Sequence, residues 1–165
     1  MALGRAVDSA SGNTWLHALR RYFAVVIPGH LAWEFAHLPL YTIWREGTAG
    51  ETIFAALHCT GGDILIATST LVLALLLAGA EWPIDRVALR RVLMLTVAFG
   101  VGYTIFSEWL NIVFREAWAY TELMPVMPVI DTGLTPLLQW IVVPTVGFWW
   151  VSRVGRATQE VEHNA

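Results

Sequence analysis

The chain has 165 residues, of which 56% are hydrophobic and 14% are charged, and nine are tryptophan. Soluble domains carry about 25% charged residues, so this composition excludes an ordinary soluble domain and favours a tryptophan-rich integral membrane protein. The net charge of -3 and the scattered arginines argue against a nucleic-acid partner, and the single cysteine, Cys59, excludes an intramolecular disulfide.

Four apolar runs follow a polar N-terminal segment. Each is close to the ~20 residues that an α-helix needs to cross a bilayer. Together they predict membrane spans at about residues 22–44, 52–80, 92–114 and 134–151. The loops at 45–51 and 81–91 are short, so neighbouring helices should run antiparallel. The expected fold is therefore all-α, with residues 1–165 forming one integral membrane domain built as a four-helix up-down bundle.

The arginines predict the orientation of this bundle, because cytoplasmic loops of membrane proteins are enriched in basic residues. Eight of the ten precede the first run, lie between the second and third, or follow the fourth, and only Arg45 and Arg115 lie on the other side. Both termini should therefore be cytoplasmic, in the inner (plasma) membrane of a bacterium. The loop at 115–131 then lies outside, and its apolar, aromatic composition predicts a lid over the outer mouth of the bundle.

The stretch Glu34-x-x-His37 lies inside the first apolar run. A charge at the centre of a membrane helix costs roughly 2.5–3.5 kcal/mol, so such a residue is a functional-site hypothesis by default. The three-residue spacing places both side chains on one helix face. Counted at about 1.5 Å per residue, His58, Asp63 and Glu108 of the next two runs reach similar depths in the outer half. The sequence therefore predicts one polar site to which three spans contribute.

Carboxylates beside imidazoles are common ligands of transition metals. The favoured hypothesis is therefore a divalent Fe, Zn or Cu ion bound by Glu34, His37, His58 and Glu108. A metal would also balance the buried carboxylates, which otherwise must hold protons. Without a metal, acid–base catalysis or a structural hydrogen-bond network remains open. The expected catalytic residues are Glu34, His58, Asp63 and Glu108, and the expected cofactor- or substrate-binding residues are Tyr41, Thr104, Asn111 and Arg115.

The expected function is a metal-dependent membrane enzyme that acts on a lipidic or amphipathic substrate near the outer leaflet. The alternative is a non-catalytic membrane subunit or an assembly factor that handles copper, since Met124 and Met127 could join His58 and Cys59 as soft ligands. A proton or ion pathway is disfavoured, because the inner halves of the runs offer no second set of ionisable residues. The expected partners are the lipid bilayer and either a lipidic substrate or a membrane protein.

Overall fold

The computed structural model describes the backbone of residues 2–163 and the side chains of residues 14–153. The chain is mostly helical, which confirms the all-α class, and the two short strands pair only with each other. The elements in chain order are α1 (Ala2–His37), the 3-10 turn η1 (Leu38–Leu40), α2 (Ile43–Glu46), α3 (Ala49–Ala78), α4 (Arg86–Trp109), the π-helical turn η2 (Leu110–Phe114), β1 (Val126–Met127), β2 (Thr132–Gly133) and α5 (Leu134–His163).

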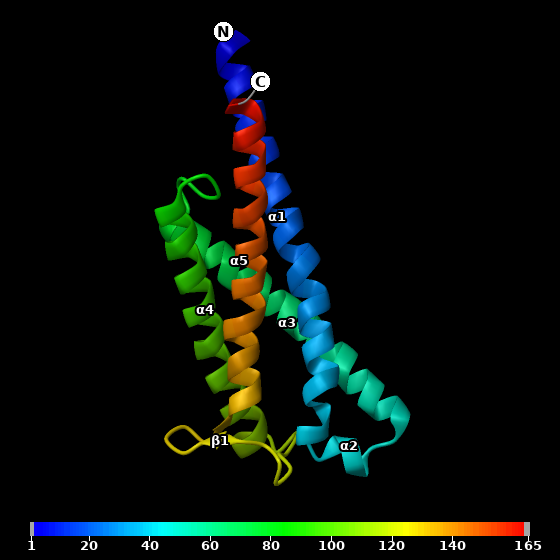
Figure 1. Cartoon of the computed structure of the whole chain (residues 1–165). Coiled ribbons are helices and arrows are strands. Elements are labelled where there is room, and N and C mark those ends of the chain that lie inside the picture. The colour runs from blue at the N-terminus through cyan, green and yellow to red at the C-terminus, as the bar shows by residue number, and fades with distance from the viewer. Residues whose placement is uncertain (1, 164–165) are drawn as a thin grey trace.

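The four long helices pack in a ring, in which α1 and α4 each contact both α3 and α5. Helices α1 and α5 run side by side, while α3 crosses behind them at an angle (Figure 1). The N-terminal end of α1 and the C-terminal end of α5 lie at one end of the molecule, and α2 and β1 lie at the opposite end (Figure 1). The chain therefore passes along the molecule an even number of times.

Among the described residues, three helices are long and apolar enough to cross a membrane: α3, α4 together with η2, and α5 from Leu134 to Arg153. The described part of α1 is not among them. The physical reason is that only the stretch 22–33 separates Arg21 from Glu34, which is shorter than the ~20 residues of a span. The prediction of apolar membrane helices is therefore supported for three of the four runs, and a span formed by α1 stays a prediction.

Proline and capping residues explain two helix ends that differ from the predicted runs. The first run continues to Trp44, but α1 ends at His37, because Pro39 disfavours a helical residue before it and has no N–H to donate. Helix α3 begins three residues before the predicted span, because Thr48 and Glu51 form a capping box. The Thr48 hydroxyl accepts from the Glu51 N–H at 3.3 Å, and the Glu51 carboxylate accepts from the Thr48 N–H at 2.8 Å.

Helices α4 and α5 also extend beyond their predicted runs, each at the end nearer the termini. The Asp85 carboxylate accepts a hydrogen bond from the Ala88 N–H at 2.7 Å and so starts α4 at Arg86, six residues before the predicted span. Helix α5 continues past Val151 to His163. Hydropathy marks only the apolar part of a helix. The helical backbone can extend beyond that part, because its ends depend on what satisfies the free N–H and C=O groups.

Residues 115–131 fold across the end of the bundle, against η1 and α2. Residues 119–121 pair with residues 40–42 around the antiparallel bridge Tyr41–Tyr120, with N···O distances of 2.9 and 3.0 Å. Arg45 donates to Glu122 at 2.8 Å on the surface, and this hydrogen bond lowers the pKa of the Glu122 carboxyl. The segment is therefore fastened to the chain that follows α1, at the end where the polar residues lie.

The apolar core fills the half of the molecule nearer the termini. All four long helices contribute buried side chains to it, among them Tyr22 of α1, Leu71 of α3, Val92 of α4 and Phe148 of α5. Each of these four is at most 1% exposed. Tight packing at this end leaves the other half of the bundle to hold the polar side chains.

Candidate functional site

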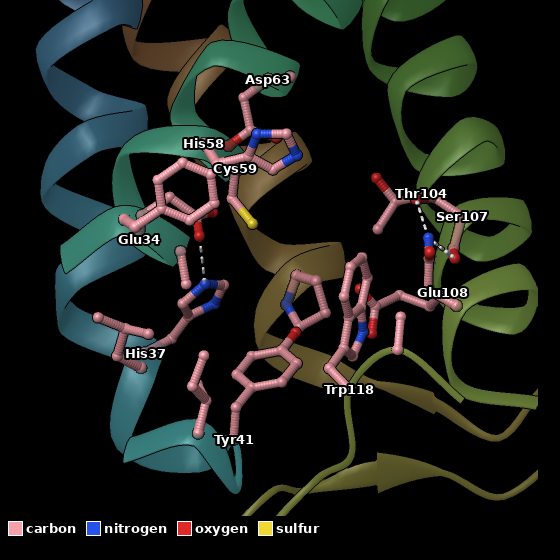
Figure 2. Close-up of a pocket in the computed structure, with 18 of the residues that line it drawn as sticks. Glu34, His37, Tyr41, His58, Cys59, Asp63, Thr104, Ser107, Glu108 and Trp118 are labelled. Atoms are coloured by element: carbon pink, nitrogen blue, oxygen red, sulfur yellow. Dashed lines mark hydrogen bonds and ion pairs between the residues drawn. The ribbon is translucent and has the colours of Figure 1, made fainter. Parts of the chain in front are cut away.

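A pocket of about 960 Å³ opens in the half of the bundle away from the termini. This volume lies in the range of roughly 300–1,000 Å³ that is typical of small-molecule sites. Figure 2 shows Glu34 and His37 on one side of the pocket and Glu108 and Trp118 on the other. All nine predicted site residues line this pocket: Glu34, His37, Tyr41, His58, Asp63, Thr104, Glu108, Asn111 and Arg115.

Glu34 and His37 form a hydrogen-bonded pair in the last turn of α1. His37 Nε2 lies 3.2 Å from a Glu34 carboxyl oxygen, and the two residues are 7% and 6% exposed. With Glu34 ionised, its oxygen can only accept, so Nε2 carries the hydrogen of this bond. In a neutral imidazole this leaves Nδ1 as a lone-pair acceptor, and that atom is buried with no partner among the described residues. The pair therefore presents an oriented base.

Gln139 of α5 lies at the centre of the buried polar groups. Its Nε2 is 2.8 Å from Asp63 Oδ2, 3.1 Å from Glu34 Oε1 and 2.9 Å from His30 Nδ1. An amide nitrogen has two hydrogens, so it can serve only two of these three acceptors at once. His30 Nδ1 also lies 3.4 Å from Asp63 Oδ2. The network therefore connects α1, α3 and α5 through one amide.

Glu108 of α4 is held by the segment that crosses the end of the bundle. Tyr120 donates its hydroxyl hydrogen to a Glu108 oxygen, and the Tyr120 oxygen accepts from the Gly133 N–H at 2.8 Å. Burial, together with the neighbouring carboxyl, raises the pKa of Tyr120 well above its usual range. The phenol therefore keeps its proton at neutral pH and serves as a fixed donor to Glu108.

His58 lies at the rim of the pocket and is not part of this network. Its side chain is exposed and stacks on Phe54, with ring centroids 5.5 Å apart. The reason is helical geometry: His58 and Asp63 are five residues apart, which is about 140° around an ideal helix, and the buried face of α3 contains Asp63. In the described structure His58 makes no hydrogen bond to Glu34 or Asp63. Its expected acid–base role beside them therefore stays a prediction.

The expected metal ligands do not converge. Among the described residues, no three or more His, Cys, Asp and Glu side chains are placed to hold a metal ion. Glu34 bonds to His37 and Gln139, and Glu108 bonds to Tyr120. The four predicted ligands therefore share the pocket without forming one ligand group, and an Fe, Zn or Cu ion stays a prediction.

The copper-handling set is dispersed as well. Met124 is buried in the segment below the pocket, where its sulfur accepts from the Thr135 hydroxyl at 3.3 Å. Met127 is exposed, and neither methionine lines the pocket that contains His58 and Cys59. One methionine therefore packs this segment against α5, and the other faces outward.

The predicted binding residues Thr104, Asn111 and Arg115 line the pocket from α4 and from the turn η2 at its C-terminal end. Thr104 is buried and donates to the Gly100 carbonyl of its own helix at 2.9 Å. Asn111, in the π-helical turn, donates to the Ser107 carbonyl at 2.8 Å, and Arg115 reaches the Asn111 side chain at 3.4 Å. π-Helical turns occur often at functional sites. These side chains are held by local bonds, and Arg115 is exposed at the rim.

Sequence reasoning missed the tertiary partners. None of Gln139, His30 and Tyr120 is among the nine predicted site residues, yet all three bond to buried acids or to their network. The one usable signal was that Gln139 is the single strongly polar side chain inside its apolar run. No known protein family, curated protein or solved structure matches this chain.

Proposed function

We propose that this chain is a four-span protein of the bacterial plasma membrane that takes an amphipathic or lipidic molecule into its pocket. The Glu34–His37 pair would then act as acid and base on the polar head of that molecule. The observation that carries the proposal is the pocket itself, in which carboxyl, imidazole and amide groups from α1, α3, α4 and α5 meet inside an otherwise apolar bundle.

The pocket has an apolar side that suits the tail of such a molecule. Phe54 of α3 and Tyr103 of α4 line it and are 68% and 46% exposed. We infer that the pocket opens to the outer surface of the bundle between these two helices. In a membrane that surface faces lipid, so an apolar tail can enter sideways while the polar head reaches Glu34 and His37.

The chemistry of the proposal is a proton transfer. A carboxylate that holds one imidazole nitrogen fixes the ring and its tautomer, and the second nitrogen is then free to take a proton from a substrate. Glu34 holds His37 in this way at 3.2 Å, and Nδ1 is the free nitrogen. The same pair returns the proton in the second half of a reaction.

Four spans with both termini in the cytoplasm agree with the placement of the helices. The two chain ends lie at one end of the molecule (Figure 1), which is also the end to which eight of the ten arginines belong in sequence. The pocket and residues 115–131 lie at the other end, so they would face the outer leaflet.

Cysteine labelling tests this topology. In a Cys59→Ala background, Val129→Cys should react with a membrane-impermeant maleimide on intact cells, because Val129 is 91% exposed beyond the pocket end. Ile84→Cys, 67% exposed in the loop between α3 and α4, is the matched control and should react only after the inner membrane is permeabilised. Labelling of Ile84→Cys on intact cells would reverse the orientation and place the pocket in the inner leaflet.

The glycine pair in α3 tests the pocket. A Cβ added at Gly61 or at Gly62 would meet no atom within 4 Å, but only Gly62 lines the pocket. Gly62→Phe should fill the pocket and slow the alkylation of the single thiol, Cys59, by an N-alkyl maleimide by about tenfold or more, whereas Gly61→Phe should not. The measurement is intact mass against time in a mild detergent.

A medium-chain amphiphile added to the native protein should protect Cys59 in the same assay, since Cys59 is half-buried in the pocket wall. Equal alkylation rates in both phenylalanine variants, with no protection by any amphiphile, would contradict a ligand pocket at this place. Unchanged melting temperatures of the two variants provide the folding control.

A further inference from the structure

The interior of the pocket is rich in acids. Glu34, Asp63 and Glu108 lie inside it and are 6%, 9% and 7% exposed, and two more carboxylates, Glu46 and Glu51, lie exposed at its rim. Buried charges are normally paired, because an isolated buried charge is costly. Three carboxyls inside one cavity therefore need either protons or a cation to balance them.

Among the described side chains, no arginine forms an ion pair with any of the three interior acids. The sequence contains no lysine, and the only arginine ion pair among the described residues joins Arg45 to Glu122, outside the pocket. Arg115 lines the rim, where its described contact is the amide oxygen of Asn111 at 3.4 Å. His58, the other basic group at the rim, stacks on Phe54.

The partners of the three interior acids are neutral groups or imidazoles. Gln139 donates to Glu34 and Asp63, His37 donates to Glu34, and Tyr120 donates to Glu108. These bonds satisfy oxygen atoms but supply no arginine or lysine charge. A cation held in the cavity would supply it.

His37 gives an independent indication of a ligand. It is more than nine-tenths buried, at 7% exposure, it lines the pocket, and its Nδ1 has no partner among the described residues. Because Nε2 donates to Glu34, the free Nδ1 is an acceptor. An unpaired buried acceptor in a cavity lined by carboxylates suits a ligand that carries a hydrogen-bond donor.

Aromatic side chains complete the lining. Tyr41, Trp118 and Trp140 face the pocket together with the acids, and Phe54 and Tyr103 line its apolar side. Aromatic faces attract organic cations because the ring quadrupole places negative potential over the face. Carboxylates among aromatic rings, with no group of three metal-binding side chains among the described residues, suit an ammonium group better than a metal ion.

We infer that the ligand of this pocket carries a protonated amine on an apolar chain. The ammonium N–H groups donate to His37 Nδ1 and to the interior carboxylates, and the chain passes between Phe54 and Tyr103. The inference rests on the proposed function and gives it a substrate class, an amphipathic amine.

The test compares small amphiphiles of equal length on the purified full-length protein. Octylammonium should protect Cys59 from alkylation at concentrations at least about tenfold lower than 1-octanol, because only the cation balances the carboxylates. Octanoate should protect less than either. Glu108→Gln should remove most of the advantage of the amine over the alcohol, whereas Glu122→Gln, an exposed lid residue outside the pocket lining, should leave it unchanged.

The outcomes separate this inference from the proposed function. Equal protection by octylammonium and octanol would keep an amphiphile pocket and overturn the amine. No protection by any of the three would overturn both. Propylammonium as effective as octylammonium would keep the amine and overturn the lipidic chain. A rise in melting temperature with Zn²⁺ and none with octylammonium would show that the balancing cation is a metal and overturn the amine.

Discussion

Adding one methyl group at Gly100 is expected to destabilise the bundle by about 1–3 kcal/mol, the usual cost of overpacking a tight contact. A Cβ on Gly100 of α4 would overlap the indole ring of Trp140 on α5. Trp140 is 2% exposed, and its ring also packs against His30 with ring centroids 4.9 Å apart, so the indole has little room to move. The measurement is a thermal or SDS unfolding curve of Gly100→Ala in detergent.

Gly102→Ala is the matched control, two residues along the same helix. No atom lies within 4 Å of a Cβ at Gly102, so nothing opposes the gain of about 0.5–1 kcal/mol that alanine brings to a helix interior. The two variants should therefore move the unfolding midpoint in opposite directions. A stabilised Gly100→Ala would mean that α4 and α5 do not approach each other at this position, and that the wall of the pocket formed by Trp140 is placed differently.

Local sequence patterns predicted the helices well and their ends less well. The apolar runs identified α3, α4 and α5, because a span-length run of apolar side chains has few other structures open to it. The end of α1 could also have been predicted, since Pro39 lies inside the first run and prolines end helices. The capping box at Thr48 and Glu51 is equally visible in sequence, as a threonine followed three residues later by glutamate.

The site was predictable only where its contacts are local. The three-residue spacing of Glu34 and His37 predicted a shared helix face, and the two side chains do bond. Depth counting along each run brought the acids to one level, and all of them line one pocket. The depth of a residue along a helix does not give its direction around the helix axis. His58 was therefore expected to face the pocket interior, whereas α3 places it at the rim.

The long-range partners could not be derived from spacing at all. Gln139 is separated by 105 residues from Glu34 and by 76 from Asp63, and its role depends on how α5 is rotated against α1 and α3. Tyr120 reaches Glu108 because its own segment folds back over the bundle. Hydropathy and periodicity report which residues are buried, whereas the choice of partner is made by tertiary packing.

Gln139→Leu should lower the free energy of unfolding by about 3 kcal/mol or more. This loss is expected to exceed that of Gly100→Ala. Gln139 is 2% exposed, and its amide donates to Glu34 Oε1 and to Asp63 Oδ2. Leucine fills a similar volume but donates nothing, so buried carboxyl oxygens lose their partner and keep the full cost of burial. Unfolding by SDS titration in mixed micelles measures the effect.

The decisive comparison is the double variant Gln139→Leu/Asp63→Leu. Removing a donor alone leaves its acceptor unsatisfied, while replacing both by apolar groups can be nearly neutral. The double variant should therefore be more stable than the sum of the two single losses predicts, by an interaction free energy of about 1–3 kcal/mol. Thr145→Val, on the same helix, is the control: its exposed hydroxyl donates to the Ile141 carbonyl one turn earlier, so its effect should stay within about 0.5 kcal/mol. Strict additivity of the Gln139 and Asp63 losses would show that the amide and the carboxyl do not share a bond in the folded protein, and the network that joins α5 to the Glu34–His37 pair would have to be redrawn.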